Sequence, residues 1–144
     1  MYLDSAYIAK YYVNEPDAHL VRDLIRRSSD ICSSSWALIE VTCVFKRHVV
    51  ERSLTAAQGG ELLDLFRDHV STGFWNFIPI TQALLSRTAG LVRSLPPTVP
   101  IRAGDAIHLA TALDASEHEI WTNDRHLLAA AAHLGLTGKT VKAK

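Results

Sequence analysis

Four acidic residues, spread over the whole chain, stand where their carboxylates could gather around a divalent cation. They are Asp4, Glu40, Asp105 and Asp124. The flanking residues predict that Asp4 and Asp124 each follow a short strand, and that Asp105 lies in the first turn of a helix. In α/β proteins, ligands bind beyond the carboxyl ends of the strands, so these acids are expected at one rim of the sheet. Carboxylates that meet there repel one another unless cations neutralise them.

Three of the acids also have an ordinary structural interpretation. Asp4 and Asp124 stand at positions where an aspartate caps the N-terminus of a helix. A negative charge at Asp105 suits the dipole of the helix that it begins. Capping is the simpler interpretation of each residue taken alone, so the metal hypothesis depends on the set.

Glu40 is harder to explain as a structural residue. It is the only charged side chain between Ile31 and Phe45, in a helix that is apolar on nearly every face. Such a helix is expected to be buried. A lone buried carboxylate must bind a cation or raise its pKa, although a partly exposed or arginine-paired Glu40 remains the alternative.

The side chains near these acids indicate which metal to expect. Hard oxygen ligands without a zinc-type Cys/His set favour Mg²⁺ or Mn²⁺. His108 and His126 each lie within a helical turn of an acid, where we expect them to support the acids or face solvent. Arg102 and Arg125 flank acids, and either balance their charge or bind a phosphate group. No Gly-rich phosphate loop or GxSxG motif offers a rival chemistry.

The elements that must position the acids alternate between short strands and helices. Strands are expected at residues 2–3, 30–33, 74–80, 119–122 and 140–141, and helices at 6–13, 16–27, 35–49, 56–70, 82–95, 103–115 and 125–134. This alternation predicts an α/β sandwich around a mostly parallel sheet.

Composition limits the other possibilities. The 144 residues suit a single domain, 1–144, in which 139–144 are expected to form a frayed tail. With 15 basic and 15 acidic residues the formal net charge is zero, so a broad basic face for nucleic acid is not expected. The sequence shows no signal-peptide pattern and no membrane-length apolar run, which predicts a cytoplasmic protein without a membrane partner.

Four segments, in order along the chain, resemble PIN domains of the VapC toxin type. They are Tyr2-Leu-Asp-Ser-Ala6 running to Tyr11-Tyr-Val-Asn-Glu-Pro16, Ser35-Trp-Ala-Leu-Ile-Glu-Val41, Arg102-Ala-Gly-Asp-Ala-Ile-His-Leu-Ala-Thr-Ala112 and Thr122-Asn-Asp-Arg-His-Leu127. Each segment carries one acid of the set, and together they span almost the whole chain.

The resemblance implies a fold, an activity and partners. The fold is a three-layer α/β/α sandwich with about five mostly parallel strands and helices on both faces. The activity is Mg²⁺- or Mn²⁺-dependent endoribonucleolytic hydrolysis, with all four acids as catalytic and metal-binding residues and Thr122 orienting a water molecule or Asp124. The partners are an RNA substrate, a second copy in a homodimer, and a VapB-type antitoxin that covers the active site.

Other functions on a similar sheet remain to be separated. A PIN-domain nuclease of RNA processing has no toxin role, and a PIN fold kept only for binding has no activity. A phosphoacceptor signalling domain needs an acceptor aspartate after the third strand, where this chain has Ile78-Pro-Ile-Thr81. A phosphatase with an aspartate nucleophile needs a DxD motif, whereas Asp4 is followed by Ser5 and Ala6.

Overall fold

The computed structural model describes residues 1–141 and contains, within that range, five strands and seven helices. In chain order they are β1 (Tyr2–Leu3), α1 (Ser5–Tyr12), α2 (Ala18–Arg27), β2 (Cys32–Ser34), α3 (Ala37–Val50), α4 (Ala56–Ser71), β3 (Asn76–Ile78), α5 (Gln82–Ser94), α6 (Ala103–Asp114), β4 (Glu119–Trp121), α7 (Arg125–His133) and β5 (Thr137–Lys139). No helix in this range is both long and apolar enough to span a membrane.

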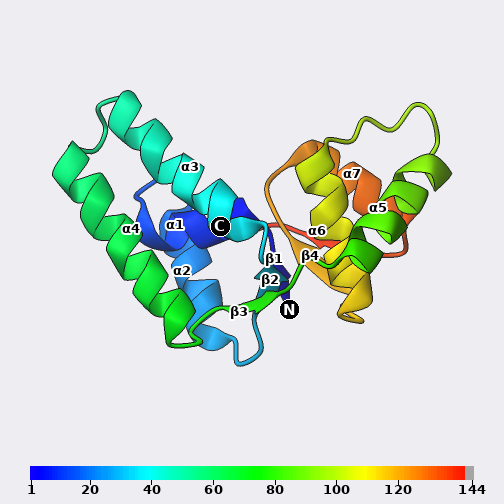
Figure 1. Ribbon diagram of the computed structural model, residues 1–144, viewed down its shortest axis with the longest axis horizontal. Coiled ribbons are helices and arrows are strands. Elements are labelled where there is room, and N and C mark those ends of the chain that lie inside the picture. The colour runs from blue at the N-terminus through cyan, green and yellow to red at the C-terminus, as the bar shows by residue number, and fades with distance from the viewer. Residues whose placement is uncertain (142–144) are drawn as a thin grey trace.

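The strands form one sheet in the order β3-β2-β1-β4-β5, with every neighbouring pair parallel. Figure 1 shows α1 to α4 on one side of the sheet and α5 to α7 on the other. The predicted three-layer sandwich with a parallel sheet is therefore confirmed, and no antiparallel strand interrupts it within residues 1–141.

Two hydrophobic cores lie on the two faces of this sheet, and β1 contributes to both. Successive strand residues point to opposite faces. Leu3 accordingly packs with α1 to α4, whereas Tyr2 packs with Leu109 of α6 and Leu127 of α7. Both β1 side chains are completely buried, so two strand residues are enough to fix this central strand.

The order in which the chain adds strands to the sheet reverses between β1 and β4. From β1 the chain adds β2 and then β3 on one side, and it returns through α5 and α6 to add β4 and β5 on the other. The backbone N–H of Asp4 donates to Trp121 O at 3.1 Å, so the ends of β1 and β4 lie side by side. This is the topological switch point at which ligands of α/β sheets bind.

Three details of the predicted elements are wrong. The strongest predicted strand, 74–80, forms only the three-residue edge strand β3, with Asn76 exposed. Strand β5 lies at Thr137–Lys139 rather than at 140–141. The predicted frayed tail, 139–144, includes residues that belong to the fold. Lys139 ends β5, and the Val141 N–H donates to the Tyr7 hydroxyl at 2.8 Å. Residues 142–144 lie outside the described range.

Helix α3 also departs from its prediction. It was expected to be buried on all sides, but Leu38 and Ile39 are 39% and 56% exposed. Only Ala37, Val41 and Phe45 of this helix are buried. The apolar pattern around Glu40 therefore reflects an exposed apolar surface as well as core packing.

Candidate active site

All four acids line one cavity of about 270 Å³ at the carboxyl ends of β1 and β4. Its other lining residues come from α1, α3, α6 and α7 and from the residue before α6; they include Ser5, Arg47, Arg102 and His108. Segments 120 residues apart in the chain thus bring their carboxylates to one place, as the positions after the strands predict.

Asp4 is the buried carboxylate of the cavity, with 5% of its surface exposed. Its Oδ1 accepts from the Tyr7 N–H at 2.9 Å and so caps α1, and its Oδ2 accepts from the Thr122 hydroxyl. Burial raises the pKa of Asp4, and these two hydrogen bonds offset that rise only in part. The ionised carboxylate therefore carries a desolvation cost that a nearby cation would relieve.

Asp105 and Asp124 face each other across one guanidinium. Arg102 donates from Nε to Asp105 Oδ2 at 2.9 Å and from Nη2 to Asp124 Oδ2 at 2.6 Å. Asp124 also caps α7, because its Oδ1 accepts from the His126 N–H at 2.8 Å. Burial favours a higher pKa for Asp124, but the backbone hydrogen bonds and Arg102 outweigh it and lower the pKa.

Glu40 does not have the environment that its sequence predicts. Its side chain is 35% exposed, and Oε2 contacts His108 Nε2 at 2.8 Å and accepts from Ser5 Oγ at 2.5 Å. Burial acts to raise its pKa, but hydrogen bonds from His108 and Ser5 outweigh burial and lower the pKa. The expected raised pKa is thus wrong, because polar neighbours from α1 and α6 compensate the carboxylate.

A chain of buried hydrogen bonds holds His108 against Glu40. The Ser34 N–H donates to the Tyr2 hydroxyl at 3.0 Å, which leaves that hydroxyl free to donate to His108 Nδ1 at 2.7 Å. In a neutral imidazole, an acceptor at Nδ1 places the proton on Nε2, where it can be donated to Glu40. Tyr2 therefore sets the tautomer that supports the Glu40 carboxylate.

We predict that Tyr2→Phe lowers the Mg²⁺ affinity of the protein about tenfold, the lower end of the usual effect of losing such a supporting hydrogen bond. Titration calorimetry measures this affinity. Tyr12→Phe is a matched control, because the Tyr12 hydroxyl also contacts a histidine Nδ1, that of His69, at 2.7 Å, but outside the acidic cavity. An equal loss in both variants would show that the effect is general destabilisation.

Gly104 allows α6 to approach Glu40 and Trp36 closely. A Cβ at this position would lie 2.8 Å from Glu40 Oε1 and 3.1 Å from Trp36 Nε1. The indole N–H of Trp36 is buried without a hydrogen-bond partner among the described residues. An added methyl group would therefore displace the Glu40 carboxylate, the more mobile of its two neighbours.

We predict that Gly104→Ala reduces the activity of this site about 10- to 100-fold, while the melting temperature changes little. Moving the end of a flexible side chain costs little stability, but it removes Glu40 from Ser5 and His108. Gly60→Ala is the control, since a Cβ there meets nothing within 4 Å and should stabilise α4 by about 0.5–1 kcal/mol. Undiminished activity of Gly104→Ala would mean that the position of Glu40 is unimportant.

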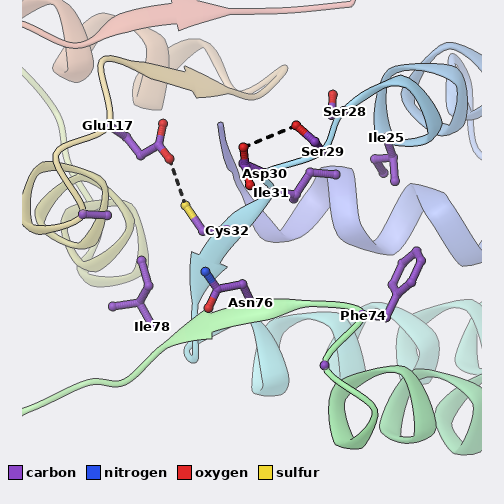
Figure 2. Close-up of a pocket in the computed structure, with 12 residues that line it drawn as sticks. Ile25, Ser28, Ser29, Asp30, Ile31, Cys32, Phe74, Asn76, Ile78 and Glu117 are labelled. Atoms are coloured by element: carbon purple, nitrogen blue, oxygen red, sulfur yellow. Dashed lines mark hydrogen bonds between the residues drawn. The ribbon is translucent and has the colours of Figure 1, made fainter.

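A larger cavity, of about 480 Å³, lies beside the amino ends of β2 and β3 (Figure 2). One of its two carboxylates, Glu117, already accepts from the N-terminal ammonium of Met1 at 2.9 Å and from the Cys32 thiol at 3.4 Å. None of the four acids lines it. Size alone therefore does not locate the candidate site.

The donor set of the smaller cavity suits a divalent cation, although its side chains are held apart. Carboxylate oxygens are the ligands that Mg²⁺ and Mn²⁺ prefer. Within residues 1–141, no three acidic, histidine or cysteine side chains converge closely enough to hold one ion. The residues therefore fit a cation by donor type: Asp4 is desolvated and would be relieved by a cation, whereas Arg102 now contacts Asp105 and Asp124.

Comparison with known proteins identifies the family. The sequence model of the PIN domain matches residues 1–134. The chain belongs to the PIN domain family. PIN domains are nucleases, so family membership indicates a nuclease. No curated protein sequence matches the chain.

A solved structure supports the fold of this PIN domain. One chain of the crystal structure of VapBC2 from Rickettsia felis, bound to a DNA fragment from its promoter, superposes with a TM-score of 0.67 and 14% identity. The match covers 98% of each chain, so it includes both layers of helices and the whole sheet.

Several residues of the site were not singled out by the sequence. Tyr2, Ser5 and Gly104 contact the acids or their supports, yet nothing in their spacing indicates chemistry. His108 was expected near the acids and is 3% exposed. The sequence signal for His108 was its position three residues after Asp105. His126 is exposed, which agrees with the prediction that it could face solvent.

Proposed function

We propose that this PIN domain is a divalent-cation-dependent endoribonuclease that acts as the toxin of a VapBC-type pair. The observation that carries the proposal is the single cavity at the switch point of the sheet, lined by Asp4, Glu40, Asp105 and Asp124. Four carboxylates around one polar cavity suit cation-assisted hydrolysis of a phosphodiester.

In this proposal the chain's own residues hold and orient the reacting groups. Asp4 and Asp105 hold Mg²⁺ or Mn²⁺, and Glu40 and Asp124 complete the set or hold water. Thr122 fixes Asp4 through its hydroxyl and accepts from the Asp124 N–H at 2.9 Å. When bound, the cation supplies Lewis acidity that favours ionisation of water and stabilises charge on the phosphate.

Arginines around the cavity supply the positive charge that a neutral chain otherwise lacks. Arg47 and Arg102 line the cavity. Guanidinium groups bind phosphate oxygens through two parallel hydrogen bonds. A local cluster of this kind can position an RNA backbone without a broad basic face.

Cleavage of purified RNA tests the nuclease part of the proposal. Defined transfer and messenger RNAs are incubated with the protein in Mg²⁺, in Mn²⁺ and in excess EDTA, and the cut ends are mapped. We expect internal cuts with either cation and none with EDTA. Full cleavage in EDTA would overturn the cation dependence.

Expression in a bacterial host tests the toxin part. The fold likeness to a chain of the VapBC2 complex supports a VapB-type antitoxin as partner. The proposal also includes a homodimer and a cytoplasmic setting, which only the resemblance to VapC toxins implies. We expect the wild-type protein to arrest growth unless the antitoxin is co-expressed, and sedimentation to give the mass of a dimer. Harmless expression of active, folded protein would favour the alternative, a PIN nuclease of RNA processing.

A further inference from the structure

Arg102 differs from the other arginine that lines the cavity, Arg47, because it contacts the acids directly. Among residues 1–141, it is the only lysine or arginine that forms an ion pair with any of the four acids. Its Nε and Nη2 donate to Asp105 Oδ2 and Oδ1 at 2.9 and 3.2 Å, and Nη2 also donates to Asp124 Oδ2 at 2.6 Å. One guanidinium thus engages three carboxylate oxygens of the candidate metal site.

Arg102 is much more exposed to solvent than the two acids that it contacts. The Arg102 side chain is 68% exposed, whereas those of Asp105 and Asp124 are 13% and 31% exposed. The acids are held in place by α6 and α7, which they help to cap. Arg102 reaches them from the solvent side, so its guanidinium can leave without disturbing the packing of either helix.

A cation that binds Asp105 and Asp124 needs the same oxygens that Arg102 now engages. The guanidinium contacts three of the oxygens that such a cation would approach, so the two positive charges would repel each other at close range. The Arg102 side chain is 68% exposed, so water can solvate its guanidinium once a divalent cation has displaced it. Once displaced, Arg102 keeps its charge beside the cavity, where phosphate is its remaining acceptor.

We propose that Arg102 is an internal counter-charge that competes with the divalent cation for Asp105 and Asp124, and that its displacement frees it to bind a phosphate of the RNA. This inference rests on the proposed function. It makes cation binding and RNA binding mutually favourable, because each removes Arg102 from the state in which it blocks the metal.

Metal binding without RNA tests the competition directly. Free Mn²⁺ is measured by electron paramagnetic resonance during titration of wild type, Arg102→Gln and Arg125→Gln. Arg125 is a matched control because it flanks Asp124 and is exposed, but forms no ion pair among the described residues. We expect Arg102→Gln to bind Mn²⁺ about five- to tenfold more tightly than wild type, and Arg125→Gln to stay within about twofold of it.

Steady-state cleavage in saturating Mn²⁺ tests the second role. We expect Arg102→Gln to raise the KM for RNA more than it lowers kcat, since the missing guanidinium binds substrate. Unchanged or weaker Mn²⁺ binding by Arg102→Gln would overturn the inference, because a purely structural ion pair would not compete with metal. Failure of every protein, wild type included, to bind Mn²⁺ would overturn the proposed function itself.

Discussion

We expect Asp4→Asn to lower the kcat of cleavage about 10³-fold or more while the protein stays folded. Losing one anionic ligand of a catalytic cation costs several kcal/mol of transition-state stabilisation, and each 1.36 kcal/mol is a factor of ten in rate. Asparagine keeps the size of aspartate and caps helices nearly as well, so the contact with Tyr7 N survives. Cleavage assays and circular dichroism on the same preparation measure both results.

The metal-free stability of the wild type, compared with this variant, depends on pH in a definite way. Burial raises the pKa of Asp4 in the folded state above its unfolded value of about 3.9. The ionised group is therefore penalised by folding, and the penalty develops as the pH rises from about 4 through the folded-state pKa. Asp4→Asn avoids it, so near pH 7 in EDTA we expect the variant to melt at or above the wild-type temperature.

Two outcomes would contradict this reading of Asp4. Near wild-type cleavage by Asp4→Asn would leave Asp4 as a helix cap alone. A large loss of metal-free stability would show that its charge stabilises the fold. Asp4→Ala provides the comparison, because it removes the cap as well and should cost about 0.5–2 kcal/mol of stability.

We expect Mg²⁺ to raise the melting temperature of the wild type, and Glu40→Gln to lose most of that rise. A ligand that binds only the folded state at 100 times its Kd adds about 2.7 kcal/mol, roughly 5–10 °C for a domain of this size. Glutamine removes the charge that attracts the cation, so we expect less than half of the rise in the variant. Scanning calorimetry of both proteins, with Mg²⁺ and with EDTA, measures the rise in melting temperature.

The environment of Glu40 also determines the stability that we expect for Glu40→Gln without metal. Hydrogen bonds from His108 and Ser5 outweigh burial and lower its pKa, so the ionised group stabilises the fold above about pH 4.5 and this contribution is lost as the pH falls further. Glutamine still accepts one of these bonds, and we expect Glu40→Gln to lose at most about 1 kcal/mol in EDTA. Glu61→Gln, an exposed residue of α4, is the control. An unaltered Mg²⁺ response in Glu40→Gln would remove Glu40 from the metal site.

The placement of three acids was predictable because local patterns determine it. Short strands and helix starts can be read from neighbouring residues, and parallel strands put their carboxyl ends at one rim. The environment of Glu40 was not predictable in this way. Whether Leu38 and Ile39 face a core or solvent depends on which helices pack against α3, and that information lies elsewhere in the chain.

The remaining errors have similar causes. Segment 74–80 has the composition of a buried strand, yet its place at the edge of the sheet leaves only Asn76–Ile78 paired. The partnership of Tyr2 with His108 joins residues 106 positions apart. Such contacts follow from the strand order, which residue spacing along one chain does not reveal.

The pairing of β1 with β4 has a consequence for synthesis. Thr122 reaches Asp4 across 118 positions of sequence, so the first acid is made long before the residues that complete its surroundings. At 5–20 residues per second, a ribosome needs about 6–24 s to extend the chain from one to the other. We expect a nascent chain to have no assembled site during that interval, and therefore to be unable to cut the message from which it is being translated.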